Sequence, residues 1–308
     1  MGNLMNLVIG RSLQLDELAK AKGEESVKKL QKCREALAQM SDYSTQVKDR
    51  WTPHERQLLR LYGEGGPVEV TIHVPKEAAG NSRNAEWPLV VYAHGGGMML
   101  GSRHDSFGAR LLNEAWEKCG PFCWASVEYR LVPEHQFPSN VDDLVSACRS
   151  LSEKALAEEF NYSPSKMCML GVSAGGFVAG HALLHHPCPC ALLYPMVDPS
   201  MGGASHRLYG DLPGCPSEWL RLAWDWLGAE RASLLEADFS PLQNSQLLLL
   251  LGSCDPLRDE GRELSKRLLR TGVAVTTIEA QGSHAMAHLV DRKSREDLFE
   301  SFKQLLPM

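Results

Sequence analysis

The sequence lacks an excess of basic residues. Its 308 residues include 32 Lys and Arg against 38 Asp and Glu, which gives a formal net charge of −6. Proteins that bind nucleic acid neutralise backbone phosphates with clustered Lys and Arg. Nucleic acid is therefore not an expected partner.

Long hydrophobic runs are also missing. The apolar stretch at the N-terminus is interrupted by Asn6 and Arg11. It is too short for the hydrophobic region of a secretory signal and for a membrane span. We therefore expect no stable membrane insertion and a cytoplasmic protein.

The spacing of the cysteines excludes the common cysteine frameworks. The nine cysteines are odd in number, are scattered along the chain and include no C-x-x-C pair, so reduced thiols are expected. Residues 185–190, His-His-Pro-Cys-Pro-Cys, hold four potential metal ligands. Two prolines stiffen this segment, and we expect no metal site there.

The sequence has the composition of a globular protein and the alternation of apolar and amphipathic segments that is typical of an α/β protein. It is 44% hydrophobic and 23% charged, which excludes a disordered or collagen-like chain. Residues 1 to about 62 are predicted to be helical, as an arm or lid. Short apolar runs follow at residues 67–74, 88–94, 122–129, 166–171, 191–194, 246–252 and 273–280. Amphipathic stretches of helical length separate them at residues 105–118, 140–159, 176–186, 258–270 and 287–304. This alternation predicts a mostly parallel sheet with helices on both faces.

One connection is longer than the others. About fifty residues separate the run that ends at Tyr194 from the run that begins at Gln246, which is too many for an ordinary loop. They include a tryptophan-rich segment with Trp219, Trp224 and Trp226. We interpret the insertion as a cap, whose tryptophans form its core or line an apolar acyl or alcohol site.

The sharpest local pattern is Gly-Val-Ser-Ala-Gly at residues 171–175, between a predicted strand and a predicted helix. A serine on so tight a turn needs small neighbours, because the backbone passes close to other segments while the hydroxyl is held above the sheet. Ser173 is therefore a candidate nucleophile. The alternative, a phosphate-binding loop, would require a GK[ST] sequence that does not follow.

A second glycine-rich segment, His-Gly-Gly-Gly at residues 94–97, ends the run 88–94. Attack by Ser173 on a carbonyl carbon would place negative charge on the oxygen, and backbone N–H groups must already point at that position. Glycines let the main chain approach closely. In this order and context, the two motifs predict a nucleophile with an oxyanion hole.

The serine needs a base and an acid, which follow it in the order acid then histidine in hydrolases of this type. His284 lies in a loop directly after the last predicted strand, whereas His288 is expected inside the final helix, so we favour His284. Asp255 lies just beyond the run 246–252, and Asp259 lies one helical turn later. We favour Asp255, which can also act as a helix N-cap before Pro256.

These residues resemble the hormone-sensitive-lipase-like branch of the α/β-hydrolase superfamily, which includes carboxylesterases and arylacetamide-deacetylase-like enzymes. The resemblance covers about residues 66–306. Its motifs are HGGG at 94–97, EYRLVPEHQFP at 128–138, SAGG at 173–176, Ser240-Pro241 and DPLRDEG at 255–261.

The resemblance implies an α/β-hydrolase fold with an eight-stranded sheet in a catalytic domain over residues 66–308. It implies a helical cap formed by the arm 1–65 and an insertion at about 195–232. It implies a catalytic triad and three oxyanion donors, with no metal or organic cofactor: Ser173, Asp255 and His284, and Gly96, Gly97 and Ala174.

The sequence departs from the family pattern at three places. Val172 replaces the usual acidic residue before the nucleophile. The loop before His284 is one residue short. Met98 and Met99 stand where an aromatic residue is usual, so together with Trp219 and Trp224 they are expected to line an adaptable substrate pocket.

From these residues we predict a serine hydrolase that cleaves small-molecule carboxylic esters of small to medium acyl chains through an acyl-enzyme. Two alternatives stay open. One is a non-catalytic small-molecule receptor on the same scaffold, and the other is an amidase or deacetylase that uses the same triad. The apolar run at 273–278 permits a homodimer through the edge of the sheet.

Overall fold

The protein is built on one large sheet. The computed structural model describes residues 15–40, 51–58, 66–76, 86–212, 214–228, 232–285 and 291–306. Within them the sheet has eight strands in the order β1-β2-β4-β3-β5-β6-β7-β8. The strands are β1 Trp51–Leu58, β2 Val68–Pro75, β3 Trp87–Ala93, β4 Cys123–Glu128, β5 Tyr162–Val172, β6 Cys190–Leu193, β7 Gln246–Gly252 and β8 Ala274–Ala280.

Strand β2 is antiparallel to both of its neighbours, β1 and β4, and every pair from β4 to β8 is parallel. Strand β7, next to the edge strand, has a continuous buried apolar run, as expected for a strand covered on both faces, whereas β8 at the edge is mostly exposed. The predicted mostly parallel α/β sheet is confirmed.

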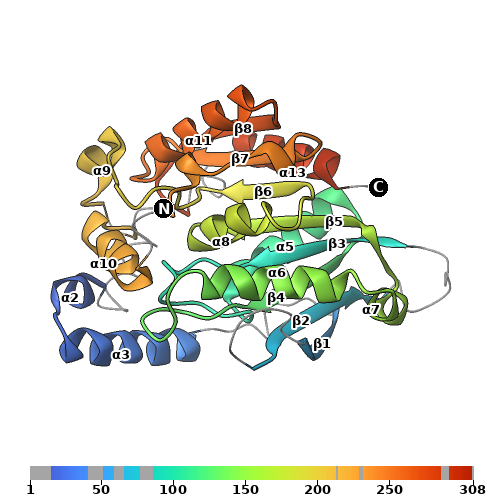
Figure 1. The fold of residues 1–308 in the computed structure, drawn as a ribbon, viewed down its shortest axis with the longest axis horizontal. Helices are drawn as coiled ribbons and strands as arrows, with labels where there is room; N and C mark the ends of the chain where they lie inside the picture. The colour runs from blue at the N-terminus through green and yellow to red at the C-terminus, as the bar shows by residue number, and fades with distance from the viewer. Residues whose placement is uncertain are drawn as a thin grey trace.

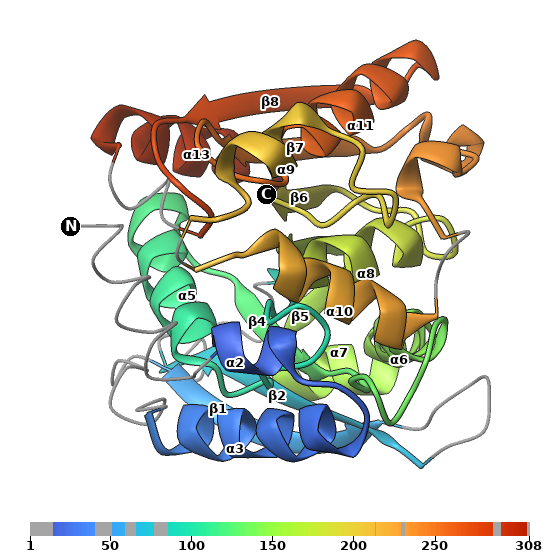
Figure 2. The ribbon, with the colours of Figure 1, turned by 90° about the vertical axis from the view of Figure 1, so that its left-hand side faces the viewer.

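Helices cover both faces of the sheet. The α-helices are α2 Leu15–Lys20, α3 Glu24–Met40, α5 Ser106–Cys119, α6 Ser139–Leu151, α7 Lys154–Phe160, α8 Ala174–Ala182, α9 Ala204–Tyr209, α10 Ser217–Leu227, α11 Arg258–Arg270 and α13 Arg292–Leu305. Figure 2 shows α5 and α13 on one side of the sheet, and α6, α8 and α11 on the other. No helix among the described residues is long and apolar enough to cross a membrane.

Two secondary-structure predictions made from the sequence are wrong. Residues 51–58 were expected to continue a helical arm, but they form strand β1, paired antiparallel with β2. Trp51 explains the difference: its indole packs edge-on against Trp116, and its Nε1 donates a hydrogen bond to Asn113 Oδ1 at 3.1 Å. Contacts with a distant helix thus override the local pattern.

The second correction concerns the predicted helix 140–159, which is two helices, α6 and α7. The α6 helix ends at Leu151, and the Ser152 hydroxyl donates to the Cys148 carbonyl at 2.8 Å. Glu153 then takes an extended conformation before α7 begins. The Ser152 hydroxyl bonds to the backbone of the preceding turn, and the chain changes direction there.

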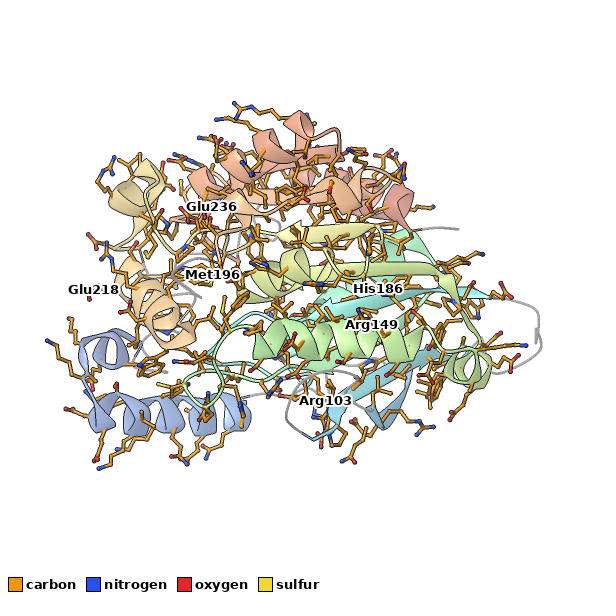
Figure 3. The ribbon with its side chains drawn as sticks, in the orientation of Figure 1. Arg103, Arg149, His186, Met196, Glu218 and Glu236 are labelled. Carbon is orange, nitrogen blue, oxygen red and sulfur yellow. The ribbon has the colours of Figure 1, made fainter. Side chains whose placement is uncertain are left out.

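The long insertion is helical, as expected, and lies at one end of the sheet. Figure 1 shows α9, α10 and α2 beyond the edge where the parallel strands finish. Helix α2 packs against α10. In Figure 3, Glu218 of α10 points away from the sheet, while Met196 lies between α10 and the strand ends. The buried side of α10 therefore faces the carboxyl ends of the strands.

Helix α3 is tied to the body of the protein by Arg34. Its guanidinium donates from Nε to the Met99 carbonyl at 2.8 Å and from Nη2 to the Val132 carbonyl at 2.7 Å. It also pairs with Glu134, at 2.7 Å from Nη1. A planar guanidinium can hold several acceptors at fixed angles, so Arg34 anchors the arm to the loop after β3.

An aromatic cluster joins α8 to the insertion. His181 lies edge-on to Phe177 and to Phe137, and Phe177 lies edge-on to Trp224. The His181 Nε2–H donates to the Ala232 carbonyl at 3.0 Å. Burial among these groups lowers the pKa of His181 from its ordinary value of 6.5 to about 4, because desolvation disfavours the imidazolium.

This lowered pKa predicts acid sensitivity. The neutral ring's contribution to stability is complete above pH 6.5, the pKa of the unfolded chain, and is lost as the pH falls toward 4. Between pH 8 and pH 5, His181 should lower the free energy of unfolding by roughly 2 kcal/mol. Urea unfolding of wild type and His181→Gln at both pH values tests this. An equal pH dependence in the two proteins would contradict it.

Candidate active site

Ser173 stands at the sharp turn between β5 and α8. Its backbone has φ 55° and ψ −115°, a strained conformation for a residue with a side chain. The turn is fixed from outside, because Ser173 N–H donates to the Leu193 carbonyl at 2.9 Å. A Cβ at Gly171 would lie 2.3 Å from the Gly175 carbonyl oxygen. The small residues predicted to be necessary are therefore required by contact.

The structure brings Ser173, His284 and Asp255 into one hydrogen-bonded series. His284 Nε2 lies 2.9 Å from Ser173 Oγ, and His284 Nδ1 lies 2.8 Å from Asp255 Oδ2. An ionised carboxylate only accepts, so the Nδ1–H donates to Asp255 and leaves the lone pair of Nε2 facing the serine hydroxyl. This is the proton arrangement that a general base requires.

The series is shielded from solvent: Ser173 is 5% exposed, His284 7% and Asp255 fully buried. Asp255 lies just after β7 and also accepts the Leu257 N–H at 2.8 Å through Oδ1, so both of its oxygens are engaged. The loop after β8 is held beside it, since Cys254 N–H donates to the Gly282 carbonyl at 2.9 Å. His288, the histidine weighed against His284, lies outside the described residues.

Asp259 does not join this series. Its side chain accepts hydrogen bonds from the Ser205 N–H and from Arg258, each at 2.9 Å. Neighbouring Arg258 and Arg262 hold the pKa of the Asp259 carboxyl below its ordinary value, although its partial burial acts in the opposite direction. The two aspartates that the sequence left in competition thus have different partners.

The glycine-rich loop after β3 lies against Ser173. A Cβ at Gly95 would be 3.5 Å from the Ser173 Cβ. Gly96 and Gly97 have φ of 116° and 60°, and Leu100 N–H donates back to the Gly96 carbonyl at 2.9 Å. Positive φ values favour glycine, and they turn this stretch of main chain alongside Ser173. Ala174, the next candidate donor, is the first residue of α8, where the helix dipole is positive.

His94 and Tyr129 support this glycine-rich loop, and the sequence alone predicted no role for them. The His94 ring is fully buried and stacks on Tyr129, with ring centres 4.2 Å apart. The Tyr129 hydroxyl donates to the His94 carbonyl at 2.6 Å. Their presence in the HGGG and EYR blocks was the only sequence signal for them.

The four residues predicted to line a substrate pocket lie in different settings. Trp219 is 5% exposed, and its indole rests on Gly97, since a Cβ there would lie 2.4 Å from the ring. Trp224 packs edge-on against Phe177, 5.0 Å between ring centres. Met98 and Met99 are completely buried. Trp219 is thus the tryptophan of this set that packs against the glycine-rich loop.

The cysteines and histidines elsewhere in the described part of the chain form no ligand cluster. All nine cysteines lie among the described residues and outside any disulfide, and burial raises the pKa of several of them, to about 12 for Cys188. Among the described residues, no group of three or more His, Cys, Asp or Glu side chains could hold a metal ion.

Comparisons with known proteins agree with this architecture. A family model described as alpha/beta hydrolase fold matches residues 90–288. The chain is 32% identical over 203 residues to an ethyl acetate hydrolase from Pseudomonas putida, covering 60% of this chain and 61% of that protein. It is 31% identical over 220 residues to carboxylesterase NlhH from Mycobacterium tuberculosis, covering 65% and 66%.

Among solved structures, a bacterial heroin esterase superposes with a TM-score of 0.78 at 25% identity, over 91% of this chain and 92% of that one. An esterase from Pyrobaculum calidifontis superposes with a TM-score of 0.74 at 23% identity, over 90% and 91%. The chain spans about three fifths of the length of the first curated relatives it matches. The family match covers well over half of the chain, which therefore belongs to the α/β-hydrolase fold family, in its hormone-sensitive-lipase-like branch.

Proposed function

We propose that the protein is a serine carboxylesterase, with Ser173 as nucleophile, His284 as general base and Asp255 as the acid that orients it. One observation carries the proposal: the continuous series from Asp255 Oδ2 through His284 to Ser173 Oγ, with hydrogen-bond distances of 2.8 and 2.9 Å. Nucleophile, base and orienting acid within reach of one another characterise acyl transfer by an activated serine.

In the first half of the reaction, His284 Nε2 takes the Ser173 proton as Oγ attacks the ester carbonyl carbon. Asp255 stabilises the imidazolium that forms. The carbonyl oxygen becomes an oxyanion, for which the backbone N–H groups of Gly96, Gly97 and Ala174 are the proposed donors. Donors already in place need no rearrangement as the charge develops, and for this reason they lower the barrier.

In the second half, the imidazolium gives its proton to the departing alcohol, and Ser173 is left acylated. Water then attacks the acyl carbon, and His284 takes the proton from that water. Collapse of the second tetrahedral intermediate releases the carboxylic acid and returns the proton to Ser173. His284 takes or gives the proton in each of these steps, so the proposed reaction uses no cofactor.

The proposed substrates are small-molecule esters with small to medium acyl chains. The printed names of the relatives, ethyl acetate hydrolase and carboxylesterase, support esters of this size. Trp219 on Gly97 limits the room beside the proposed oxyanion donors. We also propose that α2, α3 and the insertion at about 195–232 act as the cap of a catalytic domain over residues 66–308.

The alternatives differ in how well they suit this site. A receptor that had lost catalysis would not need a histidine bonded to both Ser173 and Asp255, and that pairing supports an enzyme instead. An amidase would use the same triad, and the relatives' names favour esters. A cytoplasmic location and a homodimer through the exposed β8 edge stay predictions.

Ser173→Ala should abolish ester hydrolysis while leaving the fold intact. Removing the nucleophile of a serine hydrolase costs about 10⁴-fold or more in kcat. The measurement is hydrolysis of p-nitrophenyl esters from acetate to decanoate, with circular dichroism of both proteins as the check on folding. A folded Ser173→Ala variant that kept wild-type turnover would overturn the proposal.

The two aspartates offer a matched pair of variants. Asp255→Asn replaces the acceptor for the His284 Nδ1–H, so the ring loses the correct tautomer, and kcat should fall by about 10³- to 10⁴-fold. Asp259→Asn leaves that contact untouched and should retain at least about a tenth of the activity. If instead Asp259→Asn caused the larger loss in kcat, the acid would be misassigned.

Trp219→Phe should widen acyl-chain selectivity. The smaller ring frees space beside Gly97, so kcat/KM for p-nitrophenyl octanoate relative to butyrate should rise by about ten-fold. Trp226→Phe, on the same helix and only half-buried, is the control and should leave the ratio unchanged. Equal ratios in wild type and both variants would show that Trp219 does not border the acyl site.

A further inference from the structure

A second buried histidine–carboxylate pair lies outside the proposed catalytic residues. His206 of α9 and Glu260 of α11 are 6% and 5% exposed, and His206 Nε2 lies 3.0 Å from Glu260 Oε2. On the other side of the ring, His206 Nδ1 lies 3.2 Å from the Oγ of Ser217, the first residue of α10. Burying such a pair costs free energy unless each partner is hydrogen-bonded. Both residues have such partners here.

Glu260 stands at the base of the insertion. Its Oε1 accepts the Val197 N–H at 2.8 Å, where the chain leaves the end of β6. The Val197 carbonyl in turn accepts the Leu234 N–H at 3.0 Å, where the chain returns toward β7. One carboxylate therefore bonds to the start of the insertion and, through His206, to its first helix.

The residues beside Glu260 bind the same helix. Ser205 Oγ donates to the Pro256 carbonyl at 2.6 Å, and Ser205 N–H donates to Asp259 at 2.9 Å. Arg258 Nη1 donates to the Tyr209 hydroxyl at 3.2 Å. All of these partners follow Asp255 within five residues, so α9 is fastened to the loop that carries the proposed catalytic acid and to the first turn of α11 after it.

Through Ser217 and helix α10, the pair is connected to the glycine-rich loop. Ser217 N–H donates to the Gly210 carbonyl at 2.8 Å, which closes the loop between α9 and α10. A Cβ at Gly210 would lie 2.3 Å from Ser217 Oγ, so the two segments are in tight contact. Two residues further along α10, Trp219 rests on Gly97. The contacts run without a break from Glu260 to the proposed oxyanion hole.

Ser217, His206 and Glu260 share the residue types of a catalytic triad, but their surroundings point to a tether. The Ser217 hydroxyl lies between the His206 ring and the His206 carbonyl oxygen, 3.4 Å away, and its N–H is bonded to Gly210. All three side chains are buried. The group is placed to hold two helices together.

We propose that His206 and Glu260 are positioning residues that hold α10 in the register that keeps Trp219 on Gly97. This proposal rests on the proposed esterase function, because it makes the pair a determinant of acyl-chain selectivity at that site. Hydrogen bonds to a buried carboxylate have a fixed geometry, whereas apolar packing of α10 alone would tolerate small shifts. Loss of the tether would move Trp219 without touching any catalytic group.

The test compares three single variants with the wild-type full-length protein, and then combines one of them with Trp219→Phe. His206→Leu removes the ring bonds at both ends, and Ser217→Ala removes one hydroxyl in case the leucine variant does not fold. Ser265→Ala is the matched control. Ser265 lies on α11, as Glu260 does, but its buried hydroxyl is hydrogen-bonded to Thr277 on β8 at 2.7 Å, away from the insertion. Rates on the p-nitrophenyl ester series are normalised by active-site titration.

We expect kcat on the butyrate to fall by about three- to ten-fold in Ser217→Ala, the effect of one lost hydrogen bond. The octanoate-to-butyrate ratio of kcat/KM should rise by a similar factor, and Ser265→Ala should change neither. Trp219→Phe should remove the effect of Ser217→Ala on the ratio, because both act through the same ring. A uniform loss on all esters, or an unchanged ratio in a folded variant, would overturn the proposal.

Hydrogen exchange keeps this test separate from the esterase assignment. Amides of α10 should exchange faster in Ser217→Ala than in wild type or Ser265→Ala, whether or not the protein cleaves esters. Absence of wild-type hydrolysis would refute the proposed function, and unchanged exchange in α10 would refute the tether. Ser173-dependent hydrolysis with unchanged selectivity would refute the proposal that the pair positions Trp219 and would leave the esterase assignment intact.

Discussion

The close approach of backbone segments around Ser173 is the constraint on which the site depends. A Cβ at Gly175 would lie 2.1 Å from the Ala93 carbonyl oxygen, and one at Gly95 would lie 3.2 Å from the Val172 carbonyl oxygen. Glycine is therefore required at position 175 for the start of α8 to pass the end of β3, and a side chain at position 95 would be crowded. This contact holds the glycine-rich loop against Ser173. The proposed mechanism needs this arrangement, because backbone N–H groups must reach the carbonyl oxygen while the hydroxyl attacks the carbonyl carbon.

The sheet supplies the remaining parts of the site from the same edge. In parallel strands the carboxyl ends lie side by side, and the loops after β3, β5, β7 and β8 all begin there. Asp255 follows β7 and His284 follows β8, and adjacent strands place them within hydrogen-bond distance. Burial of Asp255 is tolerated because both oxygens accept hydrogen bonds, one from Leu257 N–H and one from His284.

Polar contacts, in addition to apolar packing, set how the outer helices sit on this edge. Arg34 bonds α3 to the carbonyl of Met99, in the loop that carries Gly96 and Gly97. Glu260 and His206 bond the insertion to the first turn of α11, the helix that follows Asp255. The hydrophobic effect is non-directional, whereas a bidentate guanidinium or a hydrogen-bonded buried carboxylate specifies direction as well as distance.

The sequence by itself determined what depends on local chemistry. The apolar runs located seven strands, and the glycines around Ser173 and after His94 marked the turns, because small residues and positive φ are local requirements. It could not determine β1, whose Trp51 is buried by a helix some sixty residues away, nor the break between α6 and α7. Arg34, His206 and Glu260 were equally beyond it. Their partners lie tens of residues distant, and only the packing of the folded chain decides which charges meet.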